Sequence, residues 1–165
     1  MKKLTHLDSH GRAHMIDVGE KPLTARRAVA SARVVVAPET LVLLKDGGLE
    51  KGDALAVARL AGIQGAKQTA SLIPLCHPIS LDRVAVEIRF EPERSSVRLF
   101  VEARTRAATG VEMEALTGAS VAGLALIDMV KGVDRSAHLV EARLEVKEGG
   151  RSGRWTRADY EDPWA

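Results

Sequence analysis

The 165-residue chain has a single cysteine, Cys76, which excludes an internal disulfide and a zinc site made of several thiolates. Lys and Arg total 24 against 22 Asp and Glu, and the formal net charge of +2 is too small to attract nucleic acid or a membrane surface. Residues 1–14 lack the apolar segment of a signal peptide, and no run of about 18 apolar residues predicts a membrane span. These features predict a soluble, cytoplasmic protein with no nucleic-acid or membrane partner.

What is present is typical of one globular domain over residues 1–165, with 45% hydrophobic and 28% charged residues. The polar residues 1–24 predict a partly mobile arm with a brief strand at 15–18. Residues 149–165 hold both tryptophans and the only tyrosine. They predict a flexible tail that is able to become ordered on binding a ligand or a subunit.

Hydrophobic patterning between these ends predicts six main elements. In chain order they are a strand at 28–36, a helix at 53–72, strands at 84–90 and 97–103 joined by a turn at 91–94, a helix at 109–132 and a strand at 140–146, with a short extra helix at 38–44. Asp53 as N-cap and a Thr109–Glu112 capping box mark the starts of the two long helices. This order is that of the ferredoxin-like βαββαβ fold, an α+β arrangement in which helices pack on one face of an antiparallel sheet.

RNA-recognition domains share this element order and stack bases on strand aromatics. Aromatic residues make up only 3% of this chain, and the predicted central strands offer just Phe90 and Phe100. Phe90 also falls on the apolar row that is expected to face the core. The sequence therefore disfavours a nucleic-acid-binding module.

Residues 72–78 read LIPLCHP, a segment in which two prolines restrict the backbone around a Cys76-His77 pair. Pro78 biases His77 toward extended geometry and limits where its ring points. A lone histidine is more often structural than catalytic, and two adjacent residues lack the spacing of zinc ligands. The two open interpretations are a structural loop and a binding site without metal.

Lys51 lies between a Gly-Gly turn and the start of the predicted helix, where free amides and the helix dipole favour an anion such as phosphate. A solvated surface lysine is the alternative. Asp128 and Lys131 are spaced i, i+3 and share a helix face, which by itself indicates a surface ion pair. Their apolar neighbours predict partial desolvation and pKa values shifted toward the range used in catalysis.

Two carboxylates open the second long helix. Glu112 is assigned as the partner of Thr109 in the capping box, whereas Glu114 is either favoured by the helix dipole or functional. Basic residues around the glycines at 149–153, and Arg26 before the first strand, suit a polyphosphate, although a solvated tail is the commoner meaning of such a segment.

Several long motifs resemble the molybdenum cofactor biosynthesis protein C family over residues 4–154. They are LTHLD, HMIDV, KGDALAVARLAGIQGAK, LIPLCHP, TGVEMEALTGASVAGLALIDMVK and GGRSG. The resemblance implies a ferredoxin-like fold and a homohexamer built as a trimer of dimers, with active sites at the dimer interface. It also implies a lyase that converts (8S)-3',8-cyclo-7,8-dihydroguanosine 5'-triphosphate to cyclic pyranopterin monophosphate and diphosphate, on the path to molybdopterin.

The resemblance also implies residue roles. Asp128 is expected to be the principal acid/base, with Lys131 as its partner and Lys51 as a second essential amine. The expected substrate-binding positions are Leu75, Cys76, His77, Met113, Glu114 and Glu112 around the pterin-forming ring, and Arg26, Lys147 and Arg154 around the triphosphate.

No protein-held metal and no tightly bound cofactor are expected, and any Mg²⁺ is expected to arrive with the substrate triphosphate. A non-catalytic nucleotide-binding oligomer of the same fold is the alternative, because a fold does not settle function.

Overall fold

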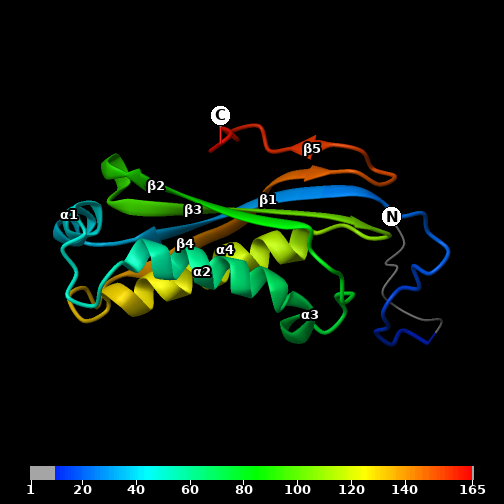
Figure 1. The fold of residues 1–165 in the computed structure, drawn as a ribbon, viewed down its shortest axis with the longest axis horizontal. Coiled ribbons are helices and arrows are strands. Elements are labelled where there is room, and N and C mark those ends of the chain that lie inside the picture. The colour runs from blue at the N-terminus through cyan, green and yellow to red at the C-terminus, as the bar shows by residue number, and fades with distance from the viewer. Residues whose placement is uncertain (1–9, 165) are drawn as a thin grey trace.

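A computed structural model describes residues 10–164 of the chain (Figure 1), so the LTHLD motif at 4–8 lies outside the described residues. In chain order the elements are β1 (Thr24–Val35), α1 (Pro38–Asp46), α2 (Ala54–Lys67), α3 (Thr69–Leu72), β2 (Arg83–Glu91), the 3-10 turn η1 (Pro92–Arg94), β3 (Ser96–Ala107), α4 (Glu112–Val130), β4 (His138–Glu148) and β5 (Trp155–Thr156).

The strands form one sheet in the order β2-β3-β1-β4-β5, and every neighbouring pair is antiparallel. Helices α2 and α4 cover one face, and the C-terminal segment with β5 runs over the other (Figure 1). β1 is inserted between β3 and β4, which is the arrangement of the ferredoxin-like fold. The predicted α+β class is confirmed.

Alternation along β1 sets the two faces of the sheet. Ala28, Ala30, Ala32 and Val34 are fully buried beneath the helices, whereas Val29 is buried on the opposite face. The strand begins at Thr24, four residues before its predicted start, because residues 24–27 already pair with β3.

Small residues let α2 and α4 approach closely, as the alanine-rich and glycine-rich composition of the first helix predicts. A side chain at Gly118 would lie 2.9 Å from the carbonyl oxygen of Gly62, and one at Gly65 would lie 2.7 Å from Val121 Cβ. Both distances are shorter than van der Waals contact. The glycines are therefore needed for this packing.

Local helix signals were correct at α1 and α2. Pro38 is the first residue of α1, and Gly47 ends that helix in the left-handed conformation with φ 67°. Asp53 caps α2 by accepting from the Ala56 N–H at 2.9 Å. The predicted single helix to Leu72 is wrong, because a turn at Gln68 separates α2 from α3, which begins at Thr69.

The capping box predicted for α4 is also wrong. The N-cap is Val111, no side chain caps the helix, and Glu112 is the first helical residue. Val111 is 1% exposed because it packs in the core, so burial fixes the helix start. Thr109 then lies outside the helix, and Glu112 is left without the structural role that the sequence assigned to it.

The two ends of the chain also differ from the sequence predictions. Residues 15–18 are not part of a strand. The tail packs against the sheet: β5 pairs with β4, and Tyr160 and Trp164 pack on Val29. Burial of these aromatic rings accounts for the docking of a segment predicted to be flexible.

Helix α4 is the one described helix with the length and mean hydropathy of a membrane span. Half of that window is buried inside the domain, because its residues pack between α2 and the sheet. This is the pattern of a core helix in a soluble protein.

Candidate active site

Lys51, Asp128 and Lys131 come together at one end of the helix layer. The loop between α1 and α2 carries Lys51, whose Nζ donates to the backbone carbonyl of Asp128 at 2.9 Å. The ammonium of Lys131 lies 2.6 Å from Asp128 Oδ1. The structure thus joins two segments 77 residues apart into one group.

The charge state of Asp128 follows from these neighbours. The hydrogen bond and charge of Lys131, and then the charge of Lys51, hold the pKa of the Asp128 carboxyl below its usual range. The side chains of Asp128 and Lys131 are 63% and 60% exposed, so the predicted desolvation is wrong for the single chain. Their apolar neighbours face the core instead.

A second group surrounds a cavity of about 300 Å³ near the start of α4. It contains all six residues expected around the ring of the substrate: Leu75, Cys76, His77, Glu112, Met113 and Glu114. The sequence argument missed Ile16, Val18 and Lys21, which line the same cavity from the N-terminal segment. The sequence does not predict that these residues lie near the LIPLCHP segment, since only the folded chain brings residues 16–21 and 75–77 together.

His77 is held by the N-terminal segment. Its Nε2 lies 2.7 Å from the carbonyl oxygen of Ile16, so Nε2 carries the proton and donates it. In the neutral ring this leaves Nδ1 as the acceptor.

The buried carboxylate in this cavity is Glu114, which is 5% exposed. Burial, with a further contribution from the charge of Glu112, raises the pKa of Glu114. Burial, with the charge of Glu114, also raises the pKa of the Cys76 thiol. Cys76 is therefore a poor nucleophile here, and Glu114 holds its proton to a higher pH than an exposed glutamate does.

The three residues expected to bind phosphate are not in either group. Arg26 donates to the carbonyls of Ala107 and Ala108 at 3.3 Å each and so supports the loop before α4. Lys147 contacts the Ser152 hydroxyl, and exposed Arg154 pairs with a β4 carboxylate at 3.4 Å.

The glycines of the hairpin between β4 and β5 bring this basic segment next to the start of β1. A side chain on Gly150 would overlap the Arg26 guanidinium, and one on Gly149 would overlap the carbonyl of Ala25. Arg26 and the segment 149–153 are therefore neighbours at the end of the sheet nearest the His77 cavity.

The two groups are far apart within one chain. Glu114 and Asp128 lie at opposite ends of α4, and a helix rises by 1.5 Å per residue, so about 21 Å of helix separates them. Each chain therefore carries two separate groups of predicted site residues.

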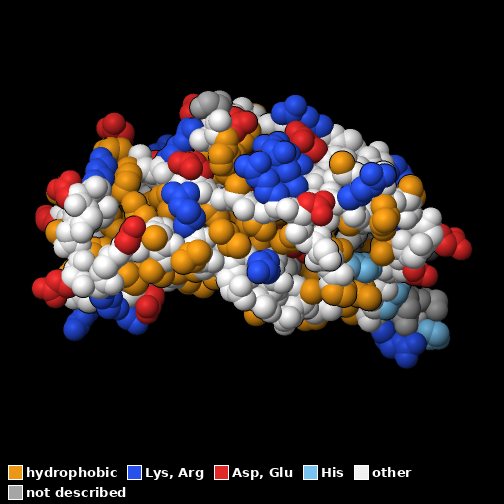
Figure 2. All heavy atoms as spheres, in the orientation of Figure 1, with side chains coloured by type: hydrophobic (Ala, Val, Ile, Leu, Met, Phe, Trp, Pro, Cys, Tyr) orange, Lys and Arg blue, Asp and Glu red, His pale blue; other side chains and the backbone are white. Residues whose placement is uncertain are grey.

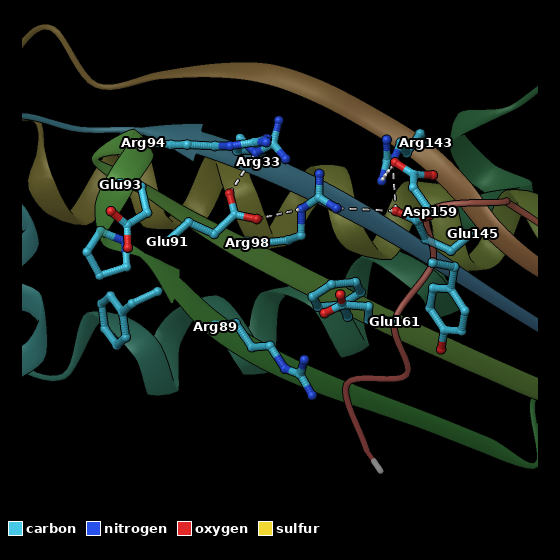
Figure 3. Close-up of a pocket in the computed structure, with 14 residues that line it drawn as sticks. Arg33, Arg89, Glu91, Glu93, Arg94, Arg98, Arg143, Glu145, Asp159 and Glu161 are labelled. Atoms are coloured by element: carbon cyan, nitrogen blue, oxygen red, sulfur yellow. Dashed lines mark hydrogen bonds and ion pairs between the residues drawn. The ribbon is translucent and has the colours of Figure 1, made fainter.

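Among residues 10–164, no three His, Cys, Asp or Glu side chains gather in a way that would hold a metal ion. A larger cavity, of about 580 Å³, lies on the opposite face of the sheet (Figure 3) and contains none of the predicted site residues. The Lys51–Asp128–Lys131 group and the His77 cavity are better candidates for the active site, because they bring together amines, carboxylates and an imidazole suited to proton transfer.

Fold and site define an α+β protein of the ferredoxin-like class with ionisable groups at both ends of one core helix. The model of the MoaC family matches residues 15–150. The chain belongs to the MoaC family.

Relatives with known names align over nearly the whole chain. The cyclic pyranopterin monophosphate synthase of Cereibacter sphaeroides is 54% identical over 155 residues, which cover 94% of this chain and 98% of that protein. The synthase of the same name from Chloroflexus aurantiacus is 52% identical, over 94% of this chain and 95% of its own. The one from Thermomicrobium roseum is 52% identical over 161 residues, with 98% and 97% covered.

Proposed function

We propose that this chain is a cyclic pyranopterin monophosphate synthase of molybdenum cofactor biosynthesis. It acts in the cytoplasm as a lyase on (8S)-3',8-cyclo-7,8-dihydroguanosine 5'-triphosphate and releases diphosphate. The observation that carries the proposal is the Lys51–Asp128–Lys131 group, which supplies a carboxylate base between two amines. The named relatives and the family match support the same activity.

The reaction closes a cyclic phosphate and needs a base. A substrate hydroxyl oxygen bonds to the α-phosphorus, the bond from that phosphorus to the diphosphate oxygen breaks, and the hydroxyl proton must be taken up. The lowered pKa keeps Asp128 ionised and able to accept a proton, while Lys51 and Lys131 stabilise developing negative charge.

Rebuilding the ring system needs groups that give protons as well. The raised pKa of Glu114 favours the protonated carboxyl that can give a proton, and His77 offers Nδ1 as an acceptor. Leu75, Cys76 and Met113 shape the cavity in which the heterocycle lies, and Glu112 contacts its polar edge.

Phosphate charge is neutralised by cations from three segments, Arg26, Lys147 and Arg154, with Lys21 at the cavity wall. The described residues offer no ligand cluster for a resident metal, so no step is assigned to one. Any Mg²⁺ enters with the triphosphate.

We further propose that a complete site forms between two chains, within a homohexamer built as a trimer of dimers. An antiparallel arrangement of two helix layers would bring the Asp128 end of one chain to the Glu114 end of its partner. Exposed hydrophobic side chains on the helix layer, which include Val57, Leu60 and Leu124, favour such a contact. Figure 2 shows hydrophobic atoms exposed along this layer, with charged side chains gathered over the sheet and tail.

The test is diphosphate release with chromatographic detection of the cyclic pyranopterin. Wild type is compared with Lys51→Ala and Asp128→Asn, and Asp46→Asn serves as a matched control because Asp46 is an exposed carboxylate outside the site. Product from wild type and Asp46→Asn alone supports the proposal. Saturable binding without product from any protein would instead support the non-catalytic oligomer.

A further inference from the structure

The side chain of Glu112 folds back over the backbone of Gly110 at the start of α4. A Cβ placed on Gly110 would overlap Glu112 Oε2, and it would lie 2.7 Å from Cδ and 2.8 Å from Oε1 of the same carboxylate. These are the three heavy atoms nearest to that position. The Glu112 carboxylate therefore occupies the space that any other residue at position 110 would fill with its own side chain.

The backbone conformation does not account for a glycine at this position. Six glycines in the described part of the chain have a positive φ, and Gly110 is not among them, so its φ is one that L-residues adopt. Helix packing does not account for it either. At Gly118 a side chain would lie 2.9 Å from a backbone carbonyl of the neighbouring helix, whereas at Gly110 it would meet the flexible end of one side chain. The glycine at position 110 therefore leaves room for a carboxylate.

No partner among residues 10–164 fixes the direction of the Glu112 side chain. The predicted capping role is absent, because no side chain caps α4. Within the same residues, no side chain donates a hydrogen bond to this carboxylate or forms an ion pair with it. The open space over Gly110 is therefore the feature of the fold that admits the carboxylate.

The carboxylate lies at the wall of the proposed active site. Gly110, Glu112 and Glu114 all line the His77 cavity, in which the heterocycle of the substrate is proposed to lie. The charge of Glu112 adds to the effect of burial in raising the pKa of Glu114. Glu112 therefore acts on the cavity from the place that Gly110 leaves open.

We infer that Gly110 is a positioning residue for the proposed reaction, because its lack of a side chain keeps open the place from which the Glu112 carboxylate faces the His77 cavity. An alanine at position 110 would displace the carboxylate into another rotamer, away from the polar edge of the substrate. No contact between Gly110 itself and the substrate is required. The effect on turnover rests on the proposed function, whereas the effect on the charge around Glu114 does not.

The first test is a double-mutant cycle in the diphosphate-release assay. Gly110→Ala should fold, since it displaces only a flexible side chain, and it should lower kcat/KM by about 10-fold to 100-fold, the loss expected for a hydrogen bond to a charged group. Glu112→Ala should have a similar effect. Adding Gly110→Ala to Glu112→Ala should then change kcat/KM by less than about twofold. A purely structural role of Gly110 would give the same loss in both backgrounds.

The second test needs no catalytic activity. Moving the charge of Glu112 away from Glu114 makes ionisation of Glu114 less unfavourable in the folded protein. The urea midpoint of Gly110→Ala should therefore rise relative to wild type at pH 8 but not at pH 4. The other ionisable groups that line the two cavities at Glu114 are Lys21, Lys67, Cys76 and His77. They are the same in both proteins, so the comparison isolates the placement of Glu112.

Gly132→Ala is the matched control, because a Cβ there meets no atom within 4 Å, and its urea midpoint should change equally at the two pH values. Unchanged kcat/KM in Gly110→Ala, an equal loss in both backgrounds, or an equal midpoint change at pH 4 and pH 8 would each overturn the inference. A wild-type protein that makes no product would contradict the proposed function instead. The urea comparison would still decide whether Gly110 places the charge of Glu112.

Discussion

The ammonium of Lys51 donates a hydrogen bond to the backbone carbonyl of Asp128, with 2.9 Å between Nζ and the oxygen. That carbonyl is in the last turn of α4, where helix carbonyls lack intrahelical partners and a cation is favoured by the dipole. Lys51 therefore caps the helix at the same point where it approaches the proposed base.

Replacing Lys51 separates these two roles. Lys51→Ala should lower the free energy of unfolding by less than about 1 kcal/mol, because an exposed cap contributes little. It should lower kcat by at least about 100-fold if the amine acts in proton transfer or charge stabilisation. Urea denaturation and the diphosphate assay measure the two effects. Lys45→Ala, which removes an exposed lysine of α1, should leave turnover unchanged, and a normal kcat in Lys51→Ala would contradict the assignment.

We expect the buried carboxyl of Glu114 to lower the free energy of unfolding while it supports turnover. A carboxyl whose pKa is raised on folding binds its proton more tightly in the folded state. Its destabilising effect is therefore absent below the unfolded pKa of about 4.5, grows as pH rises above it, and is complete above the folded pKa. Glu114→Gln should therefore be more stable than wild type at pH 8 but not at pH 4, and its turnover should fall by about 100-fold. Urea midpoints at the two pH values test this, with Glu39→Gln as an exposed control. An equal stability difference at both pH values would argue against titration of Glu114.

A shared active site predicts complementation between inactive variants. Asp128→Asn and Glu114→Gln damage the two separate groups of predicted site residues, so a dimer containing one chain of each keeps one undamaged site. Co-expression or subunit exchange should restore up to about a quarter of wild-type activity, the statistical limit for random pairing. Mixing two different Asp128 variants is the control and should restore none. No recovery, despite light-scattering proof of mixed oligomers, would place the whole site within one chain.

Alanine should have opposite effects at Gly118, inside the contact between α2 and α4, and at Gly132, in the turn after α4. Gly118→Ala should destabilise the protein by about 1–3 kcal/mol, because its Cβ would lie 2.9 Å from the carbonyl oxygen of Gly62. At Gly132 a Cβ has no neighbour within 4 Å, so Gly132→Ala should be neutral or stabilise by up to about 1 kcal/mol. Thermal unfolding of both variants tests the difference, and similar Tm values would show that the helices can move apart.

Local chemistry made several features predictable from the sequence. Pro38, Gly47 and Asp53 act through their own backbone or the next turn, so they mark helix ends reliably. The Thr109–Glu112 pattern predicted the wrong start for α4. Burial of Val111 in the core fixes that start, because tertiary packing outweighs the contribution of one capping side chain.

Features that depend on long-range contacts were not predictable from spacing. Arg33 and Arg98 become neighbours only through the pairing of β1 with β3, and no periodicity in the chain marks the cavity that they line. Tyr160, the only tyrosine, lies in a tail predicted to be flexible, and its packing on Val29 follows from a contact that spacing does not reveal. The Lys51–Asp128 contact was expected from family resemblance, since neither segment predicts the other.

The pairing of β1 with β4 also governs when this protein is able to fold. Val35 lies beside His138, and Arg27 lies beside Glu148, so the central strand finds its second partner more than 100 residues later in the chain. Closing so long a loop is entropically costly and makes such folds slow to form. During synthesis the apolar edge of β1 therefore stays open to other chains until β4 has left the ribosome, which is the interval when chaperones matter most for this protein.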